Sequence, residues 1–404
     1  MSCPSAPGET IRHAGAAALR QALQDSRRDT LATFAVYESA LAERGMAVPY
    51  DPALNPPLWE LGHIGWFQDH WIGRNSQRTR GVQADPQASR SAPMRADADA
   101  LYDSSRVAHE RRWQLPLPGA DGTRAEAAEV LARTLDLLPA QDDAQALYFH
   151  RLSLLHEDMH HEAALYMAQA LGIAITEARW QATPLPTPPA ALALPGGPWP
   201  LGSADTGFAF DNECGRHEVQ IGPCVMDAQV LRWAEYLPFV QAGGYDQARW
   251  WTREGLAWRQ KLGLACPRYL RREGDCWQQW RHGQWADLDL ALPTCHLSQH
   301  EALAWCAWAG RRLPSEAEWE CAACTAGDGF TWGQVWEWTS SRFEPYPGFV
   351  PHPYVDYSAP WFGSRAVLRG ASFGTQPRMR HPRYRNFFPA ERNDIFAGFR
   401  TCAV

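Results

Sequence analysis

"DAQALYFHRLSLLHEDMHHEAALYMAQALG", residues 143–172, is the stretch that decides the fold of the N-terminal half. Its apolar residues recur three and four positions apart and Gly172 follows the last of them, which predicts one long amphipathic helix. The same stretch contains His156-Glu157-Asp158-Met159-His160, an H-E-x-x-H pattern. On a helix this pattern is typical of zinc peptidases that use the glutamate as general base.

Three further segments of the N-terminal half predict helices. Residues 10–41 and 124–138 have the same apolar spacing, and residues 56–73 read PPLWELGHIGWFQDHWIG, with prolines at the start and a glycine at the end. Four helices of this length predict a bundle, and bundles build metal sites from side chains on facing helices.

The amino-acid composition of the chain changes after residue 182. Residues 183–200, TPLPTPPAALALPGGPWP, are rich in proline and glycine and predict an extended linker. Beyond it lie short strand-like pieces, many turns and two clear helices, at residues 233–243 and 298–310. We therefore expect a two-domain α+β protein: a helical bundle at 1–182, a linker at 183–195, and an α+β domain with much irregular structure at 196–404.

Composition restricts the function. A net charge of −7 gives no basic excess for nucleic acid, and no apolar run is long enough to span a membrane. The N-terminus lacks the apolar segment of a secretory signal, so we expect a cytoplasmic protein, with reduced thiols among its ten cysteines. Cys321 and Cys324 form a C-x-x-C within a predicted helix; buried small residues and a redox or metal pair are the two interpretations.

His156 and His160 lie four residues apart, so a helix projects both rings from one face. A third metal ligand should come from a neighbouring helix. His63, between Gly62 and Gly65 that allow a close helix approach, is the favoured candidate, and His70 is the competitor.

The kind of metal follows from the ligand set. A zinc peptidase needs a further His or Glu and an edge strand for a peptide; Glu162 and Glu177 follow the motif, but no strand-rich lobe precedes it. Three neutral imidazoles leave coordination positions open, which suits Fe(II) with O2 and a coordinating substrate. Glu162 either orients a histidine ligand or is a solvated surface carboxylate.

Several motifs together resemble a known family. "FAFDNECGRHEV", "RRLPSEAEWE", "VWEWTSS", "VLRGASF", "YRNFF" and "AGFR" resemble the formylglycine-generating-enzyme fold, which is C-type-lectin-like. "HIGWF" and the H-x-x-x-H-x-E of His156, His160 and Glu162 resemble a DinB-type bundle. This combination, over nearly the whole chain, is similar to the non-haem iron sulfoxide synthases of ergothioneine biosynthesis, and within that family it looks closest to the selenoneine synthases.

The resemblance implies Fe(II) held by His63, His156 and His160. It implies hercynine, O2 and a chalcogen donor as substrates, the donor being a selenosugar in selenoneine synthases or a cysteine-type thiol in sulfoxide synthases. A bound iron would take the selenolate or thiolate and O2 side by side, and the imidazole carbon between the two nitrogens would gain the chalcogen.

The resemblance also implies a hercynine pocket at Tyr346, Asn386, Phe387 and Met159. A quaternary ammonium donates no N–H bond, so aromatic faces and amide oxygens are expected to hold it. The alternative for Tyr346 and Phe387 is that they fill a tryptophan-rich core.

Two positions depart from one class of the family. Phe343 stands where that class has a catalytic tyrosine, and Phe388 stands where it has an acid that binds the donor's ammonium. A phenylalanine does neither, so the proton donor must lie elsewhere, and a selenosugar is favoured.

The connection between the second and third predicted helices carries Arg106, Arg111 and Arg112, which either are solvated or face an anionic or polyhydroxylated donor. A zinc hydrolase through His156-Glu157-x-x-His160 and a non-catalytic binding module remain as alternatives. We expect a monomer.

Overall fold

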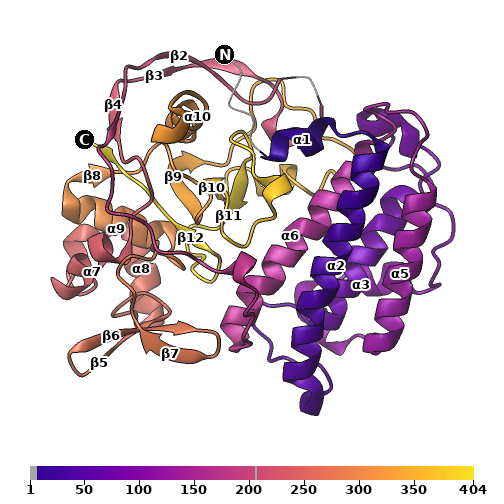
Figure 1. The fold of residues 1–404 in the computed structure, drawn as a ribbon, viewed down its shortest axis with the longest axis horizontal. Helices are drawn as coiled ribbons and strands as arrows, with labels where there is room; N and C mark the ends of the chain where they lie inside the picture. The colour runs from indigo at the N-terminus through magenta and orange to yellow at the C-terminus, as the bar shows by residue number, and fades with distance from the viewer. Residues whose placement is uncertain (1–6, 205–206) are drawn as a thin grey trace.

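The computed structural model describes residues 7–204 and 207–404. The N-terminal helices lie side by side as a bundle, and the sheets with their covering helices form the other half of the molecule (Figure 1). The N-terminal helices are α1 (Pro7–His13), α2 (Ala16–Leu41), α3 (Pro57–Gln68), α4 (Ala98–Tyr102), α5 (Ala120–Asp136) and α6 (Tyr148–Leu171).

The long bundle helices agree with the apolar spacing of the sequence, except that the helix predicted over residues 10–41 is interrupted at Ala14 and Gly15 and forms α1 and α2. Helix α6 ends at Gly172, which adopts the left-handed conformation (φ 71°) and caps the last turn through its backbone N–H. Helix α3 begins with Pro57 in its first turn, where the missing N–H costs no helical hydrogen bond. It continues as a π-helical turn over Asp69–Gly73.

The C-terminal half contains short strands in several sheets, joined by long loops. Its helices are α7 (Trp233–Gln241), α8 (Arg253–Leu262), α9 (Gln299–Ala309) and α10 (Glu316–Thr325). Its strands are β1 (Leu192–Leu194), β2 (Gly197–Leu201), β3 (His217–Ile221), β4 (Cys224–Met226), β5 (Leu270–Glu273), β6 (Cys276–Arg281), β7 (Gln284–Asp287), β8 (Arg311–Arg312), β9 (Trp336–Arg342), β10 (Ala366–Gly370), β11 (Asn386–Phe388), β12 (Ala397–Gly398) and β13 (Cys402–Ala403).

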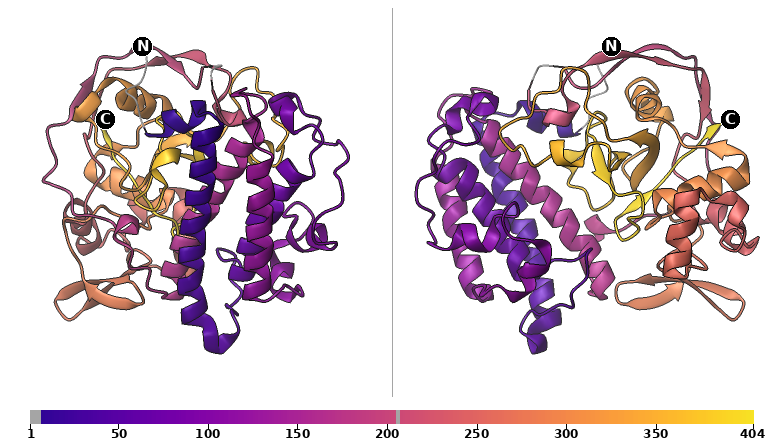
Figure 2. Two further views of the ribbon diagram at one scale, coloured as in Figure 1. Left: turned by 45° about the vertical axis from the view of Figure 1, so that its right-hand side comes forward. Right: turned by 180° about the vertical axis from the view of Figure 1, so that it is seen from behind.

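Two four-stranded sheets organise this half, in the orders β1-β4-β13-β8 and β11-β10-β9-β12. The segment expected as a linker is therefore partly a strand, because β1 pairs antiparallel with β4. Helix α8 and the β5-β6-β7 sheet were not predicted. That sheet projects at one end of the molecule, where the backbone of Trp280 accepts a hydrogen bond from Gln169 of α6 at 2.6 Å (Figure 2).

Helix α6 also forms the contact between the two halves. Arg378, from the C-terminal half, makes a two-pronged ion pair with the fully buried Asp158 at 2.6 and 2.7 Å. One turn further, Glu162 accepts hydrogen bonds from Trp336 (2.8 Å), Ser372 (2.5 Å) and Thr375 (2.7 Å). The two acids fix one face of α6 against the strands and loops of the other half.

A second connection comes from the N-terminus. Helix α1 leaves the bundle and packs on the C-terminal segment (Figure 1), where the N–H of Gly8 donates to the carbonyl of Arg380 at 3.0 Å. Arg12 pairs with the fully buried Glu213, and the ring of His381 bonds Glu9.

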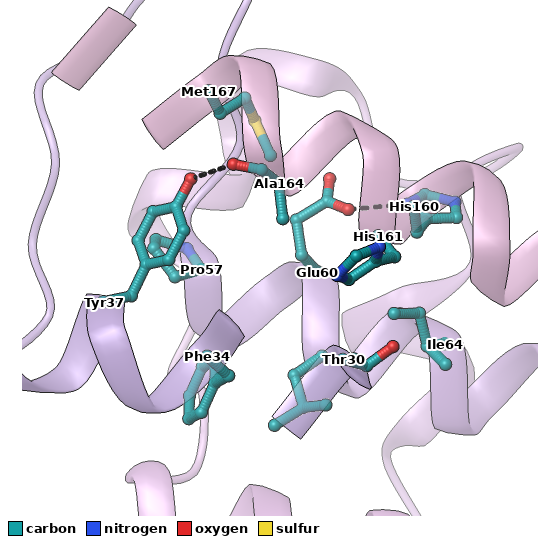
Figure 3. Close-up of a pocket in the computed structure, with 11 residues that line it drawn as sticks. Thr30, Phe34, Tyr37, Pro57, Glu60, Ile64, His160, His161, Ala164 and Met167 are labelled. Carbon is teal, nitrogen blue, oxygen red and sulfur yellow. Dashed lines mark hydrogen bonds and ion pairs between the residues drawn. The ribbon is translucent and has the colours of Figure 1, made fainter. Parts of the chain in front are cut away.

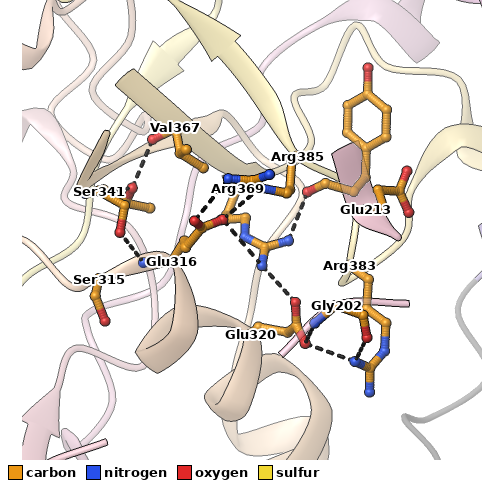
Figure 4. A network of polar contacts seen from close by, with 12 residues as sticks. Gly202, Glu213, Ser315, Glu316, Glu320, Ser341, Val367, Arg369, Arg383 and Arg385 are labelled. Carbon is orange, nitrogen blue, oxygen red and sulfur yellow. Dashed lines mark hydrogen bonds and ion pairs between the residues drawn. The ribbon is translucent and has the colours of Figure 1, made fainter. Parts of the chain in front are cut away.

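Buried ion pairs organise the interior of the C-terminal half (Figure 4). Arg369 pairs with Glu320 at 2.6 Å, and Arg385 with Glu316 at 2.9 Å. The hydroxyl of Tyr346 donates to Glu316 at 3.0 Å, and the Arg385 guanidinium lies 4.0 Å from the centre of its ring. Tyr346 therefore belongs to this network.

The structure bears on two expectations drawn from the composition, the lack of a membrane-spanning helix and the reduced state of the cysteines. None of the helices in the described part of the chain has the length and apolar character to cross a membrane. The cysteines of the C-x-x-C lie on α10, as expected, and Cys321 carries a free thiol. Cys324 is disulfide-bonded, so the expectation of reduced thiols is wrong at that residue.

Candidate metal centre

Three histidines from two helices converge at the bundle face that meets the C-terminal half. One ring nitrogen from each of His63, His156 and His160 lies within 4.8 Å of those of the other two, and the ring centroids are 4.4–5.1 Å apart. His63 comes from α3 and the other two from α6. His70 lies in the π-helical turn beside Trp66 and Trp71, outside this group.

Each of the three rings is held in a different way. His63 Nδ1 lies 2.8 Å from the carbonyl of Tyr102, and His160 Nδ1 lies 2.6 Å from a carboxylate oxygen of Glu60. Both Nδ1 atoms therefore carry the proton, which leaves Nε2 of each ring with a free lone pair. His156 stacks on Phe67 with ring centroids 3.6 Å apart.

The electrostatics keep the rings of His63 and His156 neutral. Burial and the nearby His160 lower the pKa of His63 to about 3. Burial and the other two histidines lower the pKa of His156 well below its usual range. For Glu60, burial favours the neutral acid, but His160, His63 and Arg112 outweigh it, and its pKa falls below the usual value. At neutral pH the site therefore offers imidazole lone pairs beside a carboxylate.

A set of three imidazoles whose donor atoms lie this close together fits a divalent transition metal. Imidazole suits zinc, copper, iron and nickel alike, so the donor set fits iron without selecting it. In the described part of the chain these histidines are the group of His, Cys, Asp and Glu whose donor atoms approach closely enough to share one ion.

The acidic residues of the sequence motif do not face the histidines. Glu157 is fully buried and bonds Arg27 at 2.7 Å and Gln68 at 3.1 Å, so the geometry opposes its role as a peptidase base. Glu162 is neither a support of a histidine nor a solvated carboxylate, because it is buried and bonded to Trp336, Ser372 and Thr375. Both interpretations of Glu162 are corrected.

A cavity of about 210 Å³ adjoins the histidines, between α6 and the C-terminal half. Of the residues predicted for substrate binding, Met159, Asn386 and Phe388 line it, next to His160. Its remaining walls are Glu162, Ala163, Tyr166, Trp336, Met379, Tyr384 and Ile395. Trp336 and Tyr384 stand inside quoted motifs of the sequence, but only the folded chain turns them towards α6.

Three other predicted pocket residues lie away from this cavity. Phe343 is fully buried and stacks on Phe387 with centroids 4.1 Å apart, and Tyr346 bonds Glu316. The aromatic pair packs against the core, which favours the interpretation that Tyr346 and Phe387 fill it. The aromatic residues that line the cavity are Tyr166, Trp336, Tyr384 and Phe388, and the place of Tyr346 and Phe387 in a hercynine pocket stays a prediction.

Two tyrosines near the cavity are joined by a hydrogen bond between their hydroxyl groups. The Tyr384 and Tyr357 hydroxyls are 2.9 Å apart, and Tyr384 also lies 3.4 Å from the sulfur of Met159. Tyr354, in the same loop as Tyr357, approaches the His156 ring edge-on. The sequence gives no periodic signal for this loop, and only its aromatic content could have drawn attention to it.

The arginines of the α4–α5 connection have separate positions. Arg106 and Arg111 are exposed, and Arg106 pairs with Asp103. Arg112 is half-buried, lies 3.8 Å from the centre of the Trp59 ring and donates to Asn55 at 2.8 Å. Asn55 in turn donates to Glu60 at 2.5 Å, so Arg112 connects to the histidines through side chains.

Comparison with known proteins gives the family. The sulfatase-modifying factor enzyme 1-like domain family matches residues 176–334 and 329–403. The chain is 31% identical to the hercynine oxygenase of Mycolicibacterium smegmatis, over 87% of this chain and 91% of that protein. It is also 31% identical to the hercynine oxygenase of Mycolicibacterium thermoresistibile, over 95% of this chain and 94% of that one.

A further relative covers the C-terminal half. The formylglycine-generating enzyme of Streptomyces coelicolor is 29% identical over 45% of this chain and 78% of that enzyme. The matches to hercynine oxygenases, in contrast, extend over the bundle and its histidines as well. The chain therefore belongs to the hercynine oxygenase family, the enzymes of ergothioneine-type biosynthesis that carry a sulfatase-modifying factor enzyme 1-like domain.

Proposed function

We propose that this protein is a non-haem Fe(II)- and O2-dependent enzyme that joins selenium from a selenosugar to the imidazole of hercynine. The observation that carries the proposal is the position of His63, His156 and His160 beside an aromatic cavity. The alternative donor is a cysteine-type thiol, which would make the protein a hercynine sulfoxide synthase.

Iron held by three histidines would supply open coordination positions and electrons for O2. In the oxide-forming reaction, the C–H bond of hercynine and the Se–H bond of the donor are replaced by a C–Se bond. O2 is the oxidant: one oxygen atom stays on selenium and the other leaves in water with the two hydrogens. The thiol version has the same balance with sulfur in place of selenium.

The cavity walls supply binding and orientation. Trp336, Tyr384 and Phe388 line the cavity, and the faces of such rings attract a trimethylammonium group, which has no N–H donor. The amide of Asn386 offers hydrogen bonds to the polar part of hercynine. Tyr384, whose hydroxyl is hydrogen-bonded to that of Tyr357, is a phenol at the cavity wall that can hold and deliver a proton, the role that Phe343 cannot perform.

The polar groups of the cavity favour a donor without an amino-acid ammonium. Among the lining residues the carboxylate is Glu162, and three hydrogen-bond donors already occupy it. Arg392, which lies over the Phe388 ring, is bound to Asp394 by two 2.6 Å hydrogen bonds. An uncharged polyhydroxylated donor suits such a wall better than an α-amino acid, because an ammonium group would lack a free carboxylate.

We also infer the division of the chain: a DinB-like bundle at residues 1–182, a connection at 183–195, and the formylglycine-generating-enzyme-like domain at 196–404. The family match from residue 176 onward supports the position of the second domain. The contacts among α2, α3, α5 and α6 support a four-helix bundle.

The test is aerobic incubation of iron-loaded protein with hercynine and, in parallel, a selenosugar, cysteine or γ-glutamylcysteine, followed by mass spectrometry. We expect a hercynine product that contains selenium. A sulfur-containing product from the thiols alone would establish the alternative donor. Peptide cleavage by zinc-loaded protein would support a hydrolase, and hercynine binding without turnover in any arm would support a binding module.

A further inference from the structure

The three histidine rings of the candidate centre differ in the hydrogen-bond partner of their Nδ1 atoms. A full carboxylate, Glu60, stands behind His160, and a neutral backbone carbonyl stands behind His63. Nδ1 of His156 is buried and has no hydrogen-bond partner among the described residues, so packing on Phe67 holds that ring. This asymmetry is a property of the chain itself.

We propose that Glu60 is a positioning residue that makes His160 the strongest electron donor of the three imidazoles. The inference rests on the proposed metal centre and not on the identity of the substrates. A carboxylate that accepts a hydrogen bond from Nδ1–H shifts electron density to Nε2 and fixes the ring's orientation, so the metal is held more tightly.

The position of Glu60 is itself fixed by two further residues. Its other carboxylate oxygen accepts from the Asn55 amide at 2.5 Å, and the Asn55 carbonyl oxygen accepts from Arg112 at 2.8 Å. Both carboxylate oxygens of Glu60 are thus occupied, which prevents the group from rotating away from His160.

The same arginine also reaches the second helix of the site. Its guanidinium lies 3.8 Å from the centre of the Trp59 ring, and Trp59 stacks on His63 at 4.7 Å with an interplanar angle of 10°. Arg112 therefore supports His160 through Asn55 and Glu60, and supports His63 through Trp59.

The space behind Glu60 determines which variant is informative. A cavity of about 30 Å³ lies there, with Glu60 and His160 in its wall together with Tyr37 and Met167 (Figure 3). A cavity of this size admits a water molecule, so truncation to alanine would let water take the place of the carboxylate. Glu60→Gln keeps the shape and removes only the charge.

The experiment measures cobalt(II) binding to the full chain without hercynine or O2, by competition with a chelator. We expect Glu60→Gln to bind cobalt about 10- to 100-fold more weakly, the effect typical of a lost support behind a ligand. Its visible absorption bands should also shift, because the His160 donor is weaker. Arg112→Met, which keeps the packing on Trp59, should weaken binding about threefold, in line with a more distant support.

The matched control is Glu157→Gln, a buried glutamate on the ligand helix that bonds Arg27 instead of a histidine. We expect its folded form to bind cobalt as the unaltered protein does, with the same spectrum. Equal affinity and spectrum in Glu60→Gln, or an equal loss in Glu157→Gln, would overturn the proposal. If circular dichroism shows Glu60→Gln to be unfolded, Arg112→Met takes its place: weaker cobalt binding supports the proposal, and unchanged binding overturns it.

Since no substrate is present, this result is separate from the proposed function. Normal cobalt binding with no turnover of any donor would contradict the proposed reaction and leave the metal centre standing. If the unaltered protein did not bind cobalt at all, both the proposed reaction and the proposed metal centre would be contradicted.

Discussion

Neighbouring side chains and a backbone carbonyl fix the orientation of the His63 ring. Trp59 and Trp66 stack on its ring at 4.7 and 5.6 Å, and the Tyr102 carbonyl accepts a hydrogen bond from its Nδ1–H. Gly62 allows this arrangement, because a Cβ at that residue would lie 2.2 Å from the Tyr102 ring. A ligand held this firmly loses little freedom when a metal binds, which favours affinity.

Replacement of His63 by alanine should abolish tight metal binding, because a ligand from α3 is then missing. We expect less than about a tenth of the iron retained by the unaltered protein after anaerobic loading and desalting, in line with the loss of a direct ligand. His70→Ala is the control and should retain its iron. Equal retention in His63→Ala and the unaltered protein would contradict the assignment.

Tyr384 offers a test of the proton donor. Tyr384→Phe removes a hydroxyl and keeps the aromatic wall, so hercynine affinity should change by less than about threefold while kcat falls about 100-fold or more. Isothermal titration with hercynine and steady-state turnover separate the two effects. Tyr166→Phe, at the same cavity, is the comparison and should keep most of its kcat; an unchanged kcat in Tyr384→Phe would place the proton donor elsewhere.

At the residue scale, the sequence could predict the metal centre better than the pocket. The spacing of His156 and His160 follows from helical geometry, and His63 follows from its glycine-flanked place on a facing helix. Tyr346 and Phe343 lie in an irregular loop, where no periodicity tells which way a side chain points. Their burial became visible only with Glu316 and Phe387 beside them.

Helix α6 is the element that connects the two halves. It carries His156 and His160 on one face and the buried acids Asp158 and Glu162 towards the C-terminal half. Its extent was predictable from the apolar period and from Gly172. The partners of its acids in the C-terminal half were not, because they lie more than 170 residues away in the sequence.

Loss of the Arg378–Asp158 pair should destabilise the protein markedly. Arg378→Met leaves the Asp158 carboxylate buried without its cation, which costs about 3–5 kcal/mol of unfolding free energy. Urea unfolding followed by tryptophan fluorescence measures this. The pair of the exposed Arg106 with Asp103 is the contrast, because solvent screens the Arg106 charge, and Arg106→Ala should change stability by less than about 1 kcal/mol. Similar values for the two variants would mean that the contact between the halves contributes little.

At the scale of the whole molecule, buried histidines set the response to acid. Burial is the main cause that lowers the pKa of four histidines distant from the candidate centre to about 4: His150, His296, His352 and His381. The unfolded chain binds their protons near the ordinary value of 6.5, so it takes up more protons than the folded protein between these two values. Above pH 6.5 these histidines are neutral in both states, so they no longer lower the free energy of unfolding.

We therefore expect the unfolding free energy to fall steadily as the pH decreases from 6.5 towards 4. Urea midpoints of the metal-free protein, measured from pH 7.5 to 4.5, test this, and the slope reports the number of protons taken up. His352→Gln, which can still bond the Tyr148 hydroxyl, should reduce the slope. A midpoint that stays constant from pH 6.5 to 5 would contradict the expectation.

The two-domain organisation was foreseeable from composition, whereas the way the halves join was not. The change to proline and glycine after residue 182 marks a boundary, but β1, within the expected linker, completes a sheet of the second half. Helix α1 returns across the same boundary to pack near Arg380 and Glu213. Contacts of this kind depend on matched surfaces far apart in the chain, which local spacing does not encode.

The double duty of α6 has a bearing on how such an enzyme can evolve and be dissected. In the proposed enzyme, α6 carries two of the three histidines that would hold the ion and also one wall of the cavity in which hercynine would bind. The isolated bundle would therefore lack the cavity, and the isolated C-terminal half would lack the metal ligands. Neither fragment is a smaller version of the catalyst. New donor specificity is accordingly more easily acquired at the rim, around Phe388 and Arg392, than by exchange of either half.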